Sequence, residues 1–175
     1  AFWWSSSNPK HMIEGNDGGL NFSEDGGETW RFANNLPLGQ FYHINYDMET
    51  PYNVYGGLQD NGSWKGPGYV WHSGGIQAAD WQEVSFGDGF DVVPRPDSTK
   101  YVWAMSQGGY LEYINTETGE TRLARPVHPE GKKLRYNWNA AIAQDPANPC
   151  GVYYGSQFVH YTTDCGLSWK IISPD

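Results

Sequence analysis

The stretch SEDGGETW (residues 23–30) has a counterpart near the other end of the chain, TTDCGLSW (residues 162–169). Both have the pattern hydroxyl-x-Asp-x-Gly-x-hydroxyl-Trp. Aspartate in such a turn accepts hydrogen bonds from nearby backbone N–H groups, and glycine adopts a positive φ angle that is costly for other residues. The pattern therefore predicts a structural turn rather than a carboxylate directed at a substrate. The turn residues are Ser23, Asp25, Gly27, Thr29 and Trp30 in the first copy, and Thr162, Asp164, Gly166, Ser168 and Trp169 in the second.

A longer repeat surrounds these turns. Four segments begin with a proline turn, continue with a short apolar run and end in small residues at a tight turn. They start near residues 8, 50, 95 and 148, and their prolines are Pro9, Pro51, Pro96 and Pro149. The third segment needs a two-residue insertion to align with the others. A period of about 40–50 residues is typical of one β-propeller blade per repeat.

The composition also favours short strands joined by tight turns. The 175 residues include 9 Trp, 12 Tyr, 7 Phe and 22 Gly, and only 18% of them are charged. We therefore expect an all-β chain, folded over residues 1–175 as one β-propeller segment of about four blades. Each repeat should contain an apolar strand (residues 12–14, 54–56, 101–105 and 152–154). Two repeats should end in a strand that begins with tryptophan (residues 30–33 and 169–172).

The other two repeats differ at the position of the aspartate turn. The third has NTETGET (residues 115–121), which predicts a hairpin turn of the same kind. The second is the most divergent, with a Gly/Pro-rich excursion over residues 62–75.

Charge and hydropathy narrow the class of partner. The net charge of −9 disfavours a phosphate backbone as a ligand, so we do not expect nucleic acid. No apolar run approaches the roughly 20 residues that a membrane-spanning helix needs. The first residues, AFWWSSSNPK, lack an initiator Met and the basic and apolar parts of a signal peptide. We interpret the chain as a processed product or a piece of something longer.

The two octets resemble Asp-boxes, the turns found in bacterial neuraminidase-type (BNR) repeats, sortilin-like Vps10 propellers and xyloglucanase-like glycoside hydrolases. Three longer segments are similar to large secreted bacterial propeller proteins, which are often labelled sortilin-like or glycosyl hydrolases with BNR repeats. They are GNDGGLNFSEDGGETW, NLPLGQFYHINYD and PYNVYGGLQDNGSWKGP. The resemblance covers the whole chain. It implies a secreted, periplasmic or cell-surface propeller, completed by further blades of a longer chain or by another subunit.

Three acidic loops are candidates for catalysis: GNDGG with Asp17, LQDNG with Asp60, and SFGDGFDV with Asp88 and Asp91. In xyloglucanase-like hydrolases a catalytic aspartate lies in a D-x-GG-type turn of the first blade, and Asp17 is similar locally. A glycosidase needs two carboxylates roughly 5–10 Å apart, one with a raised pKa. Asp17 could meet that geometry with Asp60 or Asp88 if their loops share a face. Turn formation is the alternative role for all of these residues.

Some aromatic residues are candidates for stacking on a sugar. Trp64 and Trp71, in the Gly/Pro-rich segment, are the candidates for a sugar-stacking platform, because flat rings suit the apolar faces of pyranoses. Five further tryptophans are open to the same role, but we expect most of them to pack between blades: Trp3, Trp4, Trp81, Trp103 and Trp138. The five histidines show no metal-ligand spacing, so neither a metal site nor a cofactor is expected. Asp-rich glycine loops leave calcium open, although there is no EF-hand spacing.

The two cysteines predict a disulfide. Cys150 precedes one expected strand and Cys165 lies in the turn after the next, so a hairpin turning near residues 156–157 would make them cross-strand neighbours. The bridge would suit an extracellular or periplasmic location. Two free buried thiols are the alternative.

Two functions follow as expectations. The first is a secreted recognition or scaffold module that binds protein or polysaccharide through its loop face without catalysis. The alternative is a glycoside hydrolase of the xyloglucanase-like Asp-box type that uses paired carboxylates. Whether the protein is an enzyme stays open at this point, because no complete catalytic pair can be assigned.

Overall fold

The computed structural model describes residues 1–36 and 38–175. Within these residues, sixteen strands form four antiparallel sheets of four strands each, and every sheet is a meander in which neighbours in sequence pair. The only helices in the described residues are two short 3-10 turns. The prediction of an all-β chain with about four blades is therefore confirmed.

Each sheet forms one blade. Blade 1 consists of β1 (Phe2–Trp4), β2 (Met12–Asn16), β3 (Gly19–Ser23) and β4 (Arg31–Phe32). Blade 2 consists of β5 (Phe41–Tyr46), β6 (Asn53–Leu58), β7 (Ser63–Pro67) and β8 (Gln82–Ser85), with η1 (Ala78–Asp80) before β8. Blade 3 consists of β9 (Gly89–Arg95), β10 (Ser98–Ser106), β11 (Tyr110–Asn115) and β12 (Thr121–Leu123), with η2 (Gln107–Gly109) before β11. Blade 4 consists of β13 (Ile142–Gln144), β14 (Val152–Gly155), β15 (Val159–Thr162) and β16 (Lys170–Ile171).

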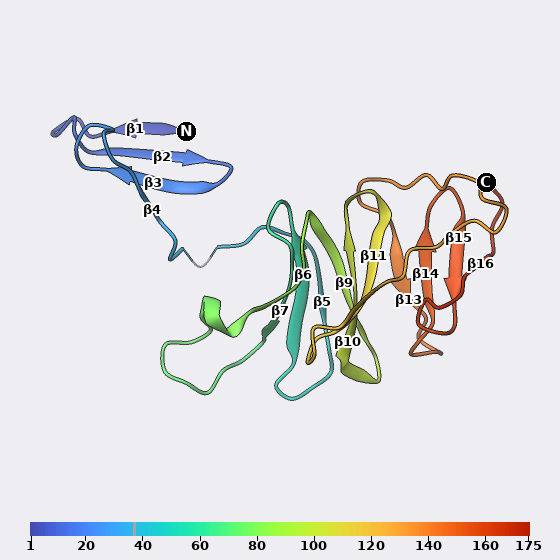
Figure 1. Ribbon diagram of the computed structural model, residues 1–175. Coiled ribbons are helices and arrows are strands. Elements are labelled where there is room, and N and C mark those ends of the chain that lie inside the picture. The colour runs from blue at the N-terminus through green and yellow to red at the C-terminus, as the bar shows by residue number, and fades with distance from the viewer. Residues whose placement is uncertain (37) are drawn as a thin grey trace. The chain divides into compact units, whose positions relative to one another are not determined.

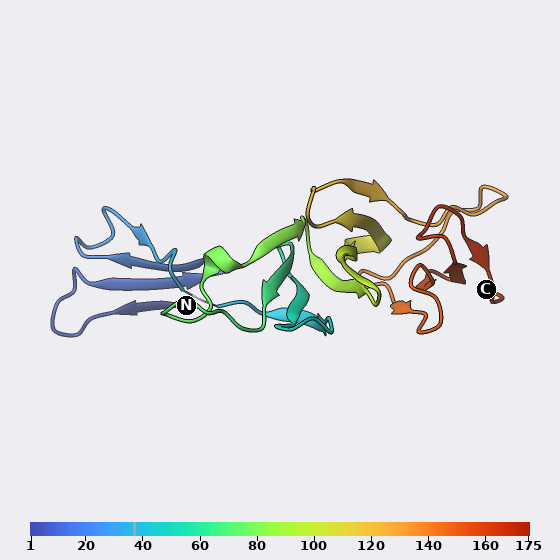
Figure 2. The same ribbon diagram turned by 90° about the horizontal axis from the view of Figure 1, so that it is seen from below.

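The chain divides into two compact units. Ala1–Leu38 contains blade 1, and Gly39–Asp175 contains blades 2, 3 and 4. Within the second unit the three sheets stand side by side in chain order (Figures 1 and 2). The expectation of one segment over residues 1–175 stays a prediction.

The proline turns lie inside the blades. Pro9, Pro51, Pro96 and Pro149 each fall between the first and second strands of a sheet, so every blade begins one strand before its proline. The Gly/Pro-rich segment of blade 2 is less irregular than expected. Its first part is strand β7, in which each residue from Ser63 to Pro67 pairs with β6, and the excursion begins after Pro67.

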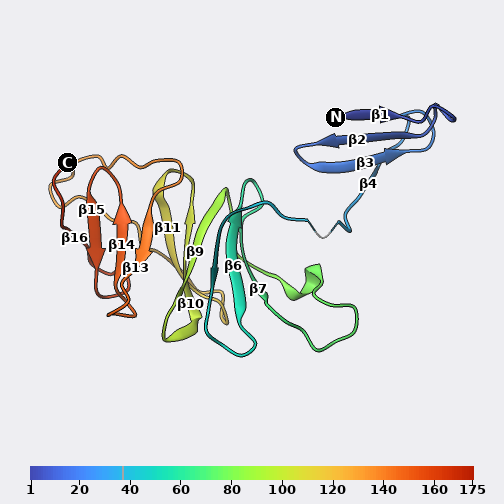
Figure 3. The ribbon, with the colours of Figure 1, turned by 180° about the vertical axis from the view of Figure 1, so that it is seen from behind.

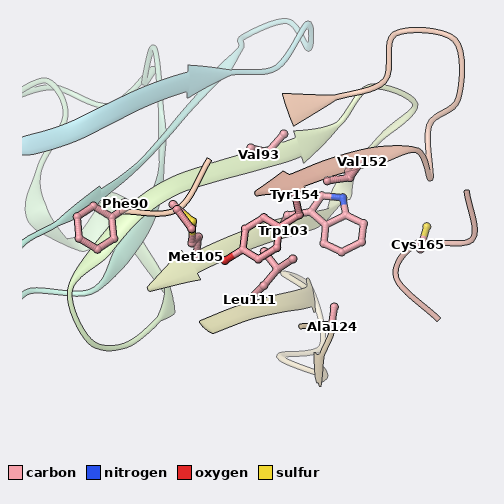
Figure 4. Close-up of a cluster of buried hydrophobic side chains, with 10 residues drawn as sticks. Phe90, Val93, Trp103, Met105, Leu111, Ala124, Val152, Tyr154 and Cys165 are labelled. Atoms are coloured by element: carbon pink, nitrogen blue, oxygen red, sulfur yellow. The ribbon is translucent and has the colours of Figure 1, made fainter. Parts of the chain in front are cut away.

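Blade 3 packs against both of its neighbours in the second unit. Because side chains alternate along a strand, Val102 and Ala104 of β10 join a buried cluster with Tyr55 of blade 2. Trp103 and Met105, on the opposite face of β10, join a second cluster with blade 4 (Figure 4). The residues of blade 4 in that cluster are Ala140, Val152, Tyr154 and Cys165. The three sheets are thus joined by apolar packing on both sides of the middle one. Figure 3 shows from behind that the sheet of blade 3 lies between those of blades 2 and 4.

The first aspartate turn, between β3 and β4, is closed by its own side chains. Ser23 Oγ donates to Asp25 Oδ1 (2.8 Å) and accepts from the Gly27 N–H (2.9 Å). Thr29 donates its N–H to Asp25 Oδ1 (3.0 Å) and its hydroxyl to Oδ2 (2.5 Å). These hydrogen bonds, the side-chain bond from Thr29 above all, hold the pKa of Asp25 well below its usual range.

The second aspartate turn, between β15 and β16, repeats the network. Thr162 Oγ1 donates to Asp164 Oδ1 (2.8 Å) and accepts from the Gly166 N–H (2.9 Å). Ser168 donates its N–H to Oδ1 (2.9 Å) and its hydroxyl to Oδ2 (2.6 Å). The hydrogen bonds from Ser168 are the main reason that the pKa of Asp164 is lowered to about 2. Both carboxylates are therefore occupied by their own turns.

The disulfide prediction is confirmed. Cys150 and Cys165 are bridged, with their Cα atoms 4.4 Å apart. The β14–β15 hairpin pairs Val152 with Thr162, which places the two cysteines just beyond the paired region. The Cys165 N–H also donates to the Cys150 carbonyl (3.2 Å). The bridge fixes the aspartate turn of blade 4 to the proline turn that precedes β14.

Candidate binding face

The loops that could form a site lie at one end of blades 2, 3 and 4. In a four-stranded meander, the turn between the second and third strands and the connection to the next blade lie at the same end. In the second unit these loops are residues 59–62, 86–88, 107–109, 124–141 and 156–158 (Figure 1). We call this end the loop face. The proline turns and the aspartate turn of this unit lie at the opposite end.

Asp88 is the centre of the hydrogen bonds on the loop face. Its side chain is buried, and its Oδ1 accepts the backbone N–H of Asp60 (2.9 Å) while its Oδ2 accepts the indole N–H of Trp138 (3.1 Å). The Asp88 N–H donates to Gln107 Oε1 (2.9 Å). One buried carboxylate therefore joins blade 2, blade 3 and the connection to blade 4, and the two N–H donors offset its desolvation.

Trp138 presents a fixed aromatic ring to solvent. The residue is 61% exposed, although its indole nitrogen is bound to Asp88 and its carbonyl accepts the N–H of Gly108 (3.0 Å). Two more exposed aromatic residues belong to the same unit: Tyr42 in β5, and Phe86 in the connection between β8 and β9. The Asp88 carboxylate thus fixes the ring of Trp138, and the Gly108 N–H fixes the backbone that carries it.

Polar side chains from the first strands of blades 2 and 3 extend this arrangement. His43 Nε2 lies 2.8 Å from the side-chain nitrogen of Asn139, the residue after Trp138. Asn45 donates to Asp91 Oδ1 (3.4 Å) and to the Val92 carbonyl (3.0 Å). Burial raises the pKa of Asp91, and the nearby His43 and the hydrogen bond from Asn45 act against that rise.

A small cavity opens beside the connection to blade 4. Its volume is about 260 Å³, and it lies between the 135–141 segment and the 155–157 turn. Ser156, in its wall, has its hydroxyl 2.7 Å from Nε2 of His160, which is fully buried. Burial lowers the pKa of His160, so its imidazole is neutral near pH 7.

The predicted catalytic aspartates fall into two groups. Asp17 is an exposed residue of the β2–β3 turn in the first unit. Asp60 occupies the corresponding β6–β7 turn of blade 2, with φ of 58°, and the structure brings it to Asp88. The contact between them is a backbone N–H on a carboxylate, rather than two carboxylates across a cleft. A catalytic role for the three residues stays a prediction.

The two tryptophans predicted as a platform lie at opposite ends of blade 2. Trp64, half-buried near the start of β7, donates its indole N–H to the Asn61 carbonyl (2.5 Å) at the loop face. Trp71 is 86% exposed in the segment after β7, at the other end, with its ring against Tyr69 (4.9 Å between centroids). Sequence reasoning did not select Trp138 as a platform. Its asparagine neighbours in the stretch YNWNA were the available sign of an exposed position.

The described residues contain no group of three or more His, Cys, Asp or Glu side chains placed to hold a metal ion. Among the same residues, no helix has the length and apolar character to cross a membrane.

The comparisons with known proteins give a fold. No family model matches the chain, and no curated protein matches it. Solved structures do. They include the GH74 xyloglucanase from Xanthomonas campestris (TM-score 0.50, 16% identity, 99% of this chain and 30% of that chain). An ancestral GH74 enzyme matches with a TM-score of 0.55 and 14% identity, over 100% of this chain and 24% of that one.

A third similar structure is the extracellular domain of a B. thetaiotaomicron protein assigned as a one-component system. Its TM-score is 0.50 at 16% identity, over 96% of this chain and 21% of that chain. This chain therefore spans between a fifth and a third of the length of these neighbours. The likeness supports a propeller without singling out the sortilin-like or BNR group. The four sheets of this chain form a segment of a β-propeller.

Proposed function

We propose that the protein is an extracellular recognition module that binds polysaccharide through the loop face of blades 2–4. The observation that carries the proposal is the exposed ring of Trp138, whose indole N–H is bound to Asp88 and whose backbone carbonyl is bound to Gly108. A flat indole face suits the apolar face of a pyranose. Because the ring is already fixed, binding costs little of its conformational freedom. Asn139 and His43, which are exposed beside it, supply hydrogen-bonding groups for sugar hydroxyls.

The location rests on separate support. A disulfide between Cys150 and Cys165 persists in oxidising compartments. The structural neighbours include an extracellular domain. We also propose that the two aspartate turns are Asp-boxes, and that further blades of a longer chain or another subunit complete the propeller.

A binding measurement with matched variants tests this function. Affinity electrophoresis and titration calorimetry against a panel of soluble polysaccharides should identify a ligand. Trp138→Ala should then weaken binding by about tenfold or more, as is usual for a tryptophan at the centre of an interface. Trp71→Ala is the matched control, because Trp71 is more exposed and lies at the opposite end of the unit. Equal losses in both variants, or no loss in either, would argue against a site at Trp138.

Asp88→Asn gives a second test of the same site. The amide keeps the shape of the side chain but has one acceptor oxygen in place of two, so either the Asp60 N–H or the Trp138 indole N–H loses its acceptor. The chemical shift of the Trp138 indole N–H shows which of them has lost it. Affinity should weaken if the indole N–H has lost its acceptor, and an unchanged affinity in that case would mean that fixation of the ring is irrelevant to binding.

A glycoside hydrolase is the second candidate. GH74 enzymes are among the structural neighbours, and burial raises the pKa of Asp91, the direction of shift that suits a general acid. The candidate carboxylates are Asp17 in the first unit and Asp60, Asp88 and Asp91 in the second. Reducing-sugar release from β-glucans, xyloglucan and sialosides, measured for the native chain and for Asp17→Ala and Asp60→Ala, tests this function. Turnover that either substitution abolishes would replace the binding proposal with catalysis.

A further inference from the structure

The three blades of the second unit share one register, so their faces can be compared position by position. Tyr55, Trp103 and Tyr153 hold equivalent positions on the second strands. They pair with Lys65, Tyr113 and Tyr161 on the third strands, in that order. Those residues pair in turn with Gln82, Arg122 and Lys170 on the fourth strands. On blades 2 and 3 the second-strand residue faces the next blade and is fully buried. On blade 4 it is only partly buried. The face of blade 4 directed away from blade 3 is here called the outward face.

The apolar positions show the same contrast. Leu111 and Ala124 of blade 3 are 0% and 2% exposed, because blade 4 covers them. Their equivalents on blade 4 are Val159 and Ile172, which are 39% and 47% exposed. The equivalence follows from the backbone: Ala124 N–H donates to the Leu111 carbonyl (2.8 Å), and Ile172 N–H to the Val159 carbonyl (2.9 Å).

A polar contact recurs at each internal junction. Gln82, on the outer strand of blade 2, donates its side-chain N–H to the Thr116 carbonyl (2.7 Å) in the outer turn of blade 3. Arg122, at the equivalent position of blade 3, donates to the carbonyls of Gly166 (3.1 Å) and Cys165 in the aspartate turn of blade 4.

Lys170 holds this position on blade 4. It pairs with Tyr161 as Arg122 pairs with Tyr113. Its side chain is exposed and makes no hydrogen bond or ion pair with the described residues. Lys170 is therefore a third side-chain donor at this position. Gln82 and Arg122 donate to the outer turn of the following blade, whereas Lys170 lies on the outward face without such a turn beside it.

We propose that the outward face of blade 4, formed by Tyr153, Val159, Tyr161, Lys170 and Ile172, docks a further four-stranded β-blade. That blade presents backbone carbonyls of its outer turn to the Lys170 ammonium. A tryptophan after the turn donates its indole N–H to the Ile172 carbonyl, just as Trp169 donates to the Ala124 carbonyl (2.9 Å) across the junction of blades 3 and 4.

The occupant is inferred from the interface that already exists one step earlier. The equivalent face of blade 3 is covered by the second strand and the aspartate turn of blade 4, including Val152, Cys165 and Trp169. The outward face repeats the donor and the apolar positions of that interface. The inference rests on the proposed completion of the propeller by further blades, and it assigns the surface and the chemistry of the contact.

An extended chain tests the docking. Residues 1–172 are followed by a second copy of residues 125–175, which places a new blade at the junction with the spacing of blades 3 and 4. Thiol titration shows whether the added copy has formed its own disulfide. Acetylation of Lys170 by acetic anhydride, followed by mass spectrometry, should be at least about tenfold slower than in the native chain. The matched control replaces tryptophan with alanine at the copied position 169, and it should restore most of the reactivity.

Three results would overturn the proposal. The first is unchanged Lys170 reactivity in an extended chain whose added disulfide has formed. The second is protection of Lys170 in the unextended chain through self-association, seen by analytical ultracentrifugation, because the occupant is then a second copy.

Substitutions in the native chain give the third result. Ala124→Asp should lower Tm by several degrees and Ile172→Asp by about 2 °C or less, so equal losses would mean that the outward face is already covered. Polysaccharide binding is read at a different surface, so its failure would leave these outcomes unchanged.

Discussion

The variants Gly166→Ala and Gly27→Ala should separate two contributions to the loss in free energy of unfolding. One is the strain of a positive φ angle within the aspartate turn, and the other is the crowding of the new Cβ atom by neighbouring residues. The two glycines occupy the same position of the octet, with φ of 78° and 93°, and both turns have the same four hydrogen bonds. A left-handed backbone costs a non-glycine residue about 1–2 kcal/mol. Both substitutions should therefore lose at least that much.

The surroundings of the two positions differ. A Cβ atom at Gly166 would lie 3.0 Å from the ring of Trp103 and 3.1 Å from the Cβ of Ala124, which belong to blade 3. At Gly27 the nearest atoms are 3.6 Å away on Met12 and 3.7 Å away on Trp30, which are ordinary contacts. Overpacking in a filled core costs about 1–3 kcal/mol more. We expect losses of about 2–5 kcal/mol for Gly166→Ala and about 1–2 kcal/mol for Gly27→Ala.

Native-state hydrogen exchange is the assay, because it reports the free energy of opening for each unit separately. The amides of β3 monitor Gly27→Ala, and those of β15 monitor Gly166→Ala. Unchanged exchange of the opposite unit is the internal control. Equal losses at the two glycines, or a larger loss at Gly27, would refute the view that blade 3 makes the second position more demanding.

Three further predictions concern the same turns. Asp25 and Asp164 have folded-state pKa values below their usual range. They therefore contribute stability that is present above about pH 4, and for Asp164 this stability is lost as the pH falls toward about 2. Asp164→Asn should flatten that part of the curve of unfolding free energy against pH, measured by urea unfolding. Replacing both Cys150 and Cys165 by serine should cost about 3 kcal/mol for a loop of this length, measured by guanidinium unfolding, and a loss near zero would contradict the constraint on the unfolded chain. Trp169→Phe keeps an aromatic ring but leaves a carbonyl of blade 3 without its donor, so it should cost about 1–3 kcal/mol in the same assay, and an unchanged midpoint would show that the hydrogen bond contributes nothing.

The candidate site was only partly predictable. Asp60 and Asp88 are 28 positions apart, and both lie in turns at the loop face, while their catalytic role stays a prediction. The sequence could not show that Asp88 binds a backbone N–H and an indole, because those donors come from turns in blade 2 and from residue 138. For the same reason, the sequence did not single out Trp138 among the tryptophans that could stack on a sugar. Its exposure depends on how a connection of irregular backbone crosses blade 3, and no periodic pattern records that path.

Local chemistry made the strands and turns readable from the sequence. Alternating apolar residues and turn-forming glycine, proline and aspartate act within a few positions of one another, so the four-blade pattern and the Cys150–Cys165 bridge could both be expected. Tertiary structure decided which of the equivalent positions are covered. Trp30 and Trp169 end equivalent turns, yet within its own unit Trp30 contacts Phe2 of the same blade, whereas Trp169 packs on Trp103 and donates to the Ala124 carbonyl of blade 3. The turn is set by residues that are close in sequence, and the environment of its tryptophan is set by a neighbouring blade, which only the folded chain supplies.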